Sequence, residues 1–162
     1  MPNANLKLPV AKLCLGLCAA AVILGCILSA AGAGEAVSQK SRTYELKVGE
    51  EVVVAGADFT MLLGGVPEDS RCPEGVDCIW AGSVGAELVF CGPKAERSGR
   101  LNTNGPPRVL KYRGRYFRIL QVSPKRVQGR EIKPSDYVLT VEVTRQAPAA
   151  QGEGDVVEIK DE

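Results

Sequence analysis

Cysteines are the residues of this chain whose type and spacing are best suited to chemistry. Cys72 and Cys78 lie six positions apart, around a short loop that contains proline and glycine. With Cys91 and Met61 they could hold a soft metal ion. In an oxidising compartment, however, a close cysteine pair forms a disulfide by default. We therefore expect a Cys72–Cys78 disulfide and no metal. Cys91, in the apolar run LVFCG, is expected to be a buried free thiol.

Other catalytic chemistry finds little support in the sequence. The chain has no histidine, which excludes every Ser-His or Cys-His pair and removes the commonest general base. No GxSxG, HExxH or P-loop pattern occurs. A group of acids near the cysteine loop could do acid–base work or bind calcium, but such residues more often cap turns (Glu68, Asp69, Glu74 and Asp77). We expect a protein that is not an enzyme and holds no cofactor.

The beginning of the chain is typical of an export signal. Lys7 and Lys12 precede residues 13–33, which carry no charge, so we assign residues 1–33 to a signal peptide or lipoprotein signal. The run ILGC resembles a lipobox and predicts cleavage before a lipidated Cys26. Cleavage after Ala33, at AGA, is a second possibility. The third is a retained apolar helix, because the run is long enough for a marginal transmembrane span.

The rest of the chain has the texture of a single β-domain. Residues 34–41 are small and polar and indicate a linker. Residues 42–145 contain runs of alternating apolar side chains, such as TYELKV and DYVLTVEV, with no sustained helical periodicity. They predict an antiparallel β-sandwich, immunoglobulin-like or a small barrel, with seven or eight strands and a hairpin at Arg113-Gly114. For the acidic tail, residues 146–162, we expect disorder, with VVEI as a possible edge strand.

Charge is distributed unevenly along the chain. Residues 94–133 carry twelve Lys or Arg and two acids, whereas residues 34–93 carry four basic and ten acidic residues, and residues 134–162 carry two and seven. The basic segment can be a patch for an anionic partner. Alternatively, it pairs across the sheet with the acidic segments. Nucleic acid is not expected as a partner. An exported protein rarely meets it, and the sequence contains no aromatic-rich basic motif.

The loop sequence DSRCPEGVDCIWAG resembles a pattern in uncharacterised bacterial envelope proteins that are often described as lipoproteins. Its form is D-S-R-C-P-x(4)-C-x-W-A-G, and two later stretches resemble the same family: V-x-P at Val122–Pro124 and D-Y-x-L-x-V at Asp136–Val141. The family has no established activity, so the resemblance implies an envelope location and a β-fold but no reaction. Cys91 is not part of the pattern.

These observations predict an exported, non-enzymatic binding or scaffolding domain at the bacterial cell envelope. Its partner would be an envelope protein or an anionic envelope surface, and the membrane would be reached through lipid or an N-terminal helix. We expect Arg71 to pair with Asp69 or with loop carbonyls, and Trp80 to cover one end of the sandwich. The alternative function is a protease or hydrolase inhibitor that presents Ser70-Arg71-Cys72 as an exposed, disulfide-braced loop. The binding candidates are Arg71, Trp80, Arg113, Arg115 and Arg118.

Overall fold

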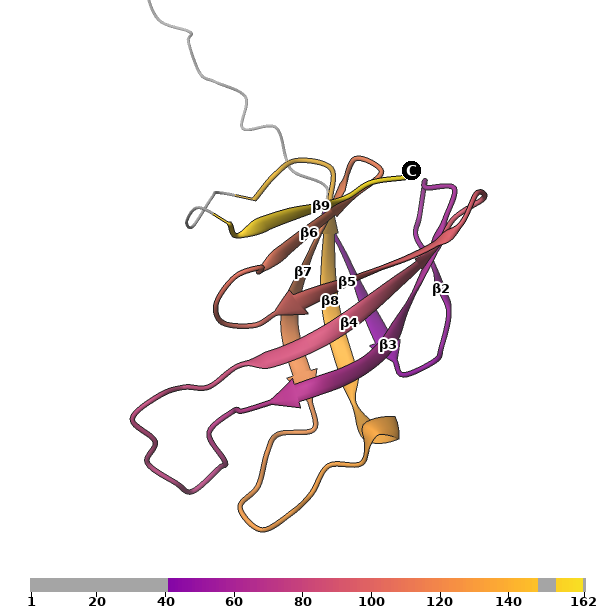
Figure 1. Ribbon diagram of the computed structural model, residues 1–162. Coiled ribbons are helices and arrows are strands. Elements are labelled where there is room, and N and C mark those ends of the chain that lie inside the picture. Colours follow the sequence, from indigo (N-terminus) through magenta and orange to yellow (C-terminus); the bar gives the residue numbers. More distant parts are fainter. Residues whose placement is uncertain (1–40, 149–153, 162) are drawn as a thin grey trace, which may run out of the picture. The chain divides into compact units, whose positions relative to one another are not determined.

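The computed structural model describes residues 41–148 and 154–161, and in these ranges the protein is all-β (Figure 1). Cys26 and the three alternatives for the export signal lie outside the described residues. The only helical element described is a single 3-10 turn, η1 (Pro134–Asp136). The strands are β1 (Arg42–Lys47), β2 (Val52–Val53), β3 (Thr60–Asp69), β4 (Val84–Cys91), β5 (Glu96–Asn102), β6 (Val109–Tyr112), β7 (Arg115–Ser123), β8 (Val138–Thr144) and β9 (Val156–Ile159).

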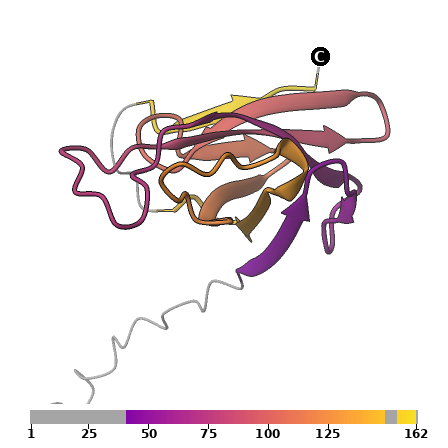
Figure 2. The same cartoon turned by 90° about the horizontal axis from the view of Figure 1, so that it is seen from below.

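Two sheets make up the domain. One has the strand order β1-β8-β7-β6-β9 and the other the order β2-β3-β4-β5, and the two lie face to face (Figure 2). Every strand pair is antiparallel except β6 with β9, which is parallel. The predicted all-β sandwich is therefore confirmed. The described residues hold nine strands rather than seven or eight, because β2 has only two residues and β9 lies in a tail of mostly small and acidic residues.

The core forms where the alternating strands face each other. Along β8 the burial alternates strictly, with Leu139, Val141 and Val143 inside, as expected of a strand that has one face on the core. β4 is more fully buried, because β3 and β5 flank it on both sides. An aromatic cluster fills the middle of the sandwich with ring centroids 4.8 to 6.2 Å apart; its members are Phe59, Phe90, Tyr112 and Phe117.

The predicted hairpin at Arg113-Gly114 is confirmed as the two-residue turn between β6 and β7. Both residues have positive φ, 45° for Arg113 and 70° for Gly114. Positive φ at both central positions is the signature of a type I′ turn, whose twist matches that of the flanking strands. Glycine is favoured at such a position because it has no Cβ.

The acidic tail differs from the expected disorder over residues 154–161. β9 pairs with β6 in a parallel register that sets Val156 beside Val109 and Ile159 beside Tyr112. Three ion pairs hold this edge: Arg108 to Asp155 at 2.6 Å, Lys111 to Glu158 at 2.9 Å, and Arg113 to Asp161 at 3.2 Å. The sequence shows a tail too polar to fold alone, but its acids match the basic side chains of β6.

The sandwich has two distinct ends. β3 ends at Asp69, which accepts a hydrogen bond from Tyr137, the residue before β8. The cysteine loop, which follows β3, therefore lies at the end of the sandwich where β8 starts. Arg42, at the start of β1, pairs with Val143 near the end of β8 and so lies at the opposite end. Within the described residues, no helix is long and apolar enough to cross a membrane.

Candidate binding site

The cysteine loop, residues 70–83, connects β3 to β4 and is closed covalently and by hydrogen bonds. The predicted Cys72–Cys78 disulfide is present, with the two Cα atoms 5.9 Å apart. At the base of the loop, the Ser70 amide donates to the Ser83 carbonyl at 2.8 Å, and the Cys72 amide donates to the Ala81 carbonyl at 3.3 Å. The loop is thus a braced extension of the β3–β4 hairpin.

Cys91 is free, as predicted, and is partly rather than fully buried. Partial burial and the nearby carboxylates of Glu51 and Glu96 raise the pKa of its thiol. A raised pKa leaves little thiolate at neutral pH, so this thiol is a poor nucleophile.

Arg71 ties the loop to the opposite sheet. Its guanidinium donates to both oxygens of Asp69, from Nε to Oδ1 at 2.9 Å and from Nη2 to Oδ2 at 2.6 Å. It also donates to the carbonyls of Val122 and Pro124, at 2.9 Å each. Since Val122 and Pro124 stand at the end of β7, one side chain joins the β3–β4 connection to the β7–β8 connection. The expected pairing of Arg71 with Asp69 is confirmed, whereas the carbonyls that it binds belong to Val122 and Pro124 rather than to the cysteine loop.

Two further side chains complete this network. The Tyr137 hydroxyl donates to Asp69 Oδ2 at 3.0 Å. Arg126 Nη1 donates to the carbonyls of Asp69 and Arg71, at 3.3 and 3.1 Å. We name Asp69, Arg71, Arg126 and Tyr137 the Arg71 latch. It brings together the three stretches on which the family resemblance depends: D-S-R-C-P supplies Asp69 and Arg71, V-x-P supplies the two carbonyls, and D-Y supplies Tyr137.

The pKa of Asp69 reflects its position in the latch. Partial burial favours its neutral form, but the hydrogen bonds and charge of Arg71, with the Tyr137 hydroxyl, outweigh burial and lower the pKa below its usual value. Burial and the neighbouring carboxylate raise the pKa of Tyr137. At neutral pH the latch therefore contains a carboxylate, two guanidinium groups and a neutral phenol, all of them hydrogen-bonded.

Gly82 is required for the chain to leave the loop. Its φ is +70°, and a Cβ at this position would lie 1.9 Å from the Ser70 carbonyl oxygen. Only glycine tolerates both conditions. The glycine of the W-A-G motif thus permits close contact between the two strands at the base of the loop.

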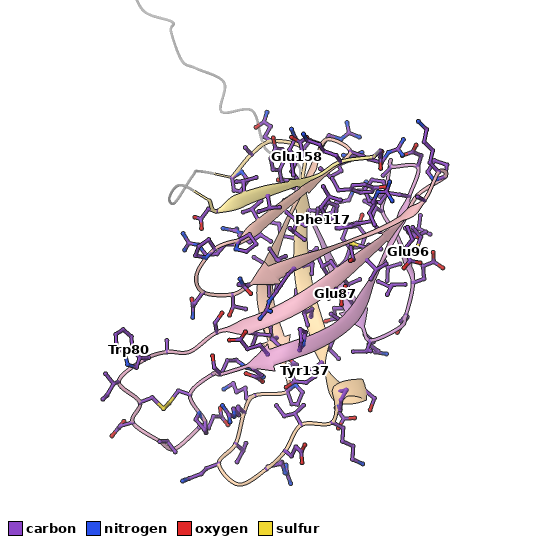
Figure 3. The ribbon with its side chains drawn as sticks, in the orientation of Figure 1. Trp80, Glu87, Glu96, Phe117, Tyr137 and Glu158 are labelled. Atoms are coloured by element: carbon purple, nitrogen blue, oxygen red, sulfur yellow. A yellow bond between two sulfur atoms is a disulfide. The ribbon has the colours of Figure 1, made fainter. Side chains whose placement is uncertain are left out.

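The outer part of the loop exposes two large apolar side chains. Ile79 is 93% exposed and Trp80 is 80% exposed, and Trp80 lies at the edge of the molecule, beyond the disulfide (Figure 3). The expectation that Trp80 covers one end of the sandwich is wrong, because the braced loop carries it away from both sheets. Other exposed apolar side chains belong to strands or to residues 124–133 (Val53, Leu120, Val127, Val156 and Val157).

A shallow cavity of about 610 Å³ lies beside the latch. Asp69 and Tyr137 of the latch line it together with Pro73 of the cysteine loop, and the connection between β7 and η1 supplies the remaining lining, from Arg126 to Ile132. Glu74 bridges the two loops, since its amide donates to the Arg126 carbonyl at 2.8 Å and its carboxylate binds Lys125 at 2.7 Å. The cavity can admit a side chain of a partner.

Arg71 is not the exposed basic residue that an inhibitor loop would present. Its side chain is 19% exposed and makes four hydrogen bonds to Asp69, Val122 and Pro124. A protease subsite that took this guanidinium would have to break all four, so the expected exposure of Arg71 is wrong.

The three predicted binding arginines of the basic segment do not form one patch. Arg118 pairs across the sheet with Glu142 at 2.6 Å. Arg113 pairs with Asp58 at 2.7 Å and with Asp161. Arg115 donates to the Gly56 carbonyl. Much of the basic segment is therefore neutralised by the acidic segments, which was the alternative explanation for the uneven charge. Arg115 is the one of the three for which no carboxylate partner is found among the described residues.

In the described ranges, no group of histidine, cysteine or acidic side chains is arranged to hold a metal ion. No family model matches this sequence, and neither a curated protein nor a solved structure is significantly similar to it.

Proposed function

We propose that this protein is a non-enzymatic binding domain of the bacterial cell envelope, and that the outer part of the cysteine loop contacts a protein partner. The disulfide is consistent with an exported protein. Attachment to the membrane through a lipidated Cys26 or through residues 13–33 belongs to this proposal, as does kinship with the envelope family that the loop resembles.

The observation that carries the proposal is the exposure of Ile79 and Trp80 on a loop that is already rigid. Tryptophan is commonly at least partly buried, and it is enriched among the residues that contribute most to protein interfaces. Binding through a preformed loop avoids much of the entropy cost of ordering. Here the disulfide and the Arg71 latch have ordered the loop before any partner arrives.

The cavity beside the latch supports the same surface. It opens at the same end of the sandwich as the loop, and its lining combines apolar Val127 and Ile132 with polar Gln128 and Glu131. Apolar side chains at the centre with polar side chains around them are the usual arrangement of a protein interface. The inhibitor function receives no such support, because Arg71 is engaged inside the protein.

Site-specific photo-crosslinking in the producing cell tests the proposal. A photoreactive amino acid at position 79 should give a dominant adduct with one envelope protein. The matched control is position 53 on β2, where Val53 is 70% exposed. Val53 pairs with Thr60 at the start of β3, away from the cysteine loop. Trp80→Ala should lower the yield of the position-79 adduct about tenfold or more, as expected for an interface hot spot.

Two results would contradict the proposal. One is an equal set of adducts from positions 79 and 53, which would show that the loop meets proteins only by collision. The other is a position-79 adduct that Trp80→Ala leaves unchanged.

A further inference from the structure

Three arginines from neighbouring strands converge at the end of the sandwich opposite the cysteine loop. Arg42 begins β1, Arg115 begins β7, and Arg145 follows the last residue of β8. The last pair between β7 and β8 is Tyr116 with Thr144, so Arg115 and Arg145 are the next residues along the two strands. We name these three residues the Arg115 cluster.

The guanidinium groups of Arg115 and Arg145 meet at the β2–β3 loop. A Cβ at Gly56 would lie 3.3 Å from Arg145 Nη2 and 3.6 Å from Arg115 Nη2, which places both groups beside this glycine. Arg42 shares the face, because it pairs with Val143 and Val143 pairs with Phe117, and alternate residues of paired strands lie on the same side of a sheet.

The charge of the cluster is not neutralised by the described residues. None of their carboxylates pairs with Arg42, Arg115 or Arg145, and the nearest acid of the β2–β3 loop, Asp58, is engaged by Arg113. Burial and the positive charges of Arg145 and Arg42 lower the pKa of Arg115. Like charges on adjacent strands are destabilising. Most other basic side chains of residues 94–133 avoid this cost, because they are ion-paired.

The cluster lies where the domain meets the segment that would lead to a membrane. From Cys26 to Arg42 a fully extended chain spans about 55 Å at most, and Arg42 is itself the first residue of β1. An anchored chain therefore has this end of the domain within reach of the bilayer. Anionic headgroups attract arginine side chains at such a surface, and guanidinium groups bind phosphate oxygens in bidentate fashion.

We propose that the Arg115 cluster docks on the phosphates of anionic lipid headgroups. The domain then rests on the membrane by this end, and the cysteine loop points away from it. This site is separate from the protein-binding loop, but the docking rests on the membrane attachment that the proposed function includes.

Hydrogen–deuterium exchange of the full chain in lipid nanodiscs tests the docking. The chain is incorporated through residues 13–33 into discs of phosphatidylcholine, with or without phosphatidylglycerol. Amides of residues 54–58 and 143–148 should exchange more slowly in the anionic discs, while residues 124–136, at the other end of the domain, serve as an internal control and should not change. The protection should disappear in high salt, which screens surface charges.

Substitutions then assign the effect to the cluster. Arg42→Gln and Arg145→Gln should each lower the protection about fivefold, since a basic side chain near an anionic surface contributes about this factor to binding. Both side chains are exposed, so the fold should survive. The matched control is Arg118→Gln, which removes an ion-paired arginine of the same sheet and should leave the protection intact.

Three outcomes would overturn the proposal. They are equal exchange in both kinds of disc, protection that survives the double substitution of Arg42 and Arg145, and protection produced in phosphatidylcholine discs by inorganic phosphate alone. The last would show a site for free phosphate rather than for a lipid surface. Loss of crosslinking at position 79 has no bearing on these results, so protein binding by the cysteine loop and lipid docking by the cluster can fail independently.

Discussion

Arg71 and Asp69 form a two-point ion pair that also orients the guanidinium toward the other sheet. The same side chain that binds both carboxylate oxygens donates to the carbonyls of Val122 and Pro124. The cysteine loop is therefore fixed at three levels: by the disulfide within it, by the hydrogen bonds at its base, and by the latch to the β7–β8 connection. This explains how a loop that exposes Ile79 and Trp80 can hold them in one place.

Substitution of Arg71 should weaken the fold more than its surface position suggests. Arg71→Ala should lower the free energy of unfolding by about 3 kcal/mol, because hydrogen bonds to charged groups contribute about 1.5–3 kcal/mol and Asp69 loses its partner. Arg71→Lys should cost about 2 kcal/mol, since an ammonium group cannot reproduce the planar fork. Urea denaturation measures both values.

Arg118→Ala is the control for this series. Its pair with Glu142 is more exposed, with 41% of the Arg118 side chain accessible, and exposed pairs contribute at most about 1 kcal/mol. Equal losses for Arg71→Ala and Arg118→Ala would mean that the latch is an ordinary surface ion pair.

The latch should also make the free energy of unfolding fall at acidic pH. The pKa of Asp69 is lowered in the folded protein from the ordinary value of 3.8, so the unfolded chain takes up this proton more readily than the folded one. The stabilisation is then fully present above about pH 4 and is lost as the pH falls through the lower, folded pKa. Urea midpoints measured down to about pH 2.5 should fall more steeply for the wild type than for Asp69→Asn. Parallel curves would show that Asp69 does not contribute to the slope.

Gly82→Ala should damage the loop base. The added Cβ meets the Ser70 carbonyl and the φ of +70° is strained for alanine, so a loss of about 2 kcal/mol or more is expected. Gly75→Ala is the matched control, because Gly75 also has positive φ but its Cβ would meet nothing within 4 Å. If both substitutions cost the same, the close contact at Gly82 is unimportant.

Removal of the disulfide should loosen the loop without unfolding the sandwich. Closing a loop of about seven residues contributes about 2 kcal/mol in the chain-entropy model, and the core of the domain does not include either cysteine. Cys72→Ser with Cys78→Ser should therefore lower stability by about this amount and leave the far-ultraviolet circular dichroism spectrum unchanged. Complete unfolding at room temperature would show that the bridge holds the fold itself.

Much of the fold could be predicted from the sequence, since it depends on local signals. Alternation identified β1 and β8, the two strand-like runs that flank Arg113-Gly114 identified the hairpin, and cysteine spacing identified the disulfide. β9 was predicted only as a possible edge strand. Its pairing depends on ion pairs between acids of the tail and Arg108, Lys111 and Arg113, which are distant in sequence.

The candidate site was harder to predict. The sequence shows Asp69 and Arg71 two positions apart, and their pairing was expected. It does not show that Val122, Pro124 and Tyr137 meet them, although all lie in the stretches that resemble the envelope family. Trp80 was misplaced for a related reason: an apolar side chain predicts burial unless the tertiary structure of its loop is known.

The most direct test of the binding loop uses Trp80 itself, the only tryptophan in the chain. Incorporation of 5-fluorotryptophan gives a single fluorine resonance, which in the isolated protein should show the full solvent isotope shift of an exposed indole. Titration with detergent-solubilised envelope proteins should shift or broaden this resonance and abolish its solvent response, while the Arg118→Gln variant behaves in the same way. A resonance that stays sharp and fully solvent-responsive throughout the titration would contradict the proposal that the cysteine loop binds a protein partner.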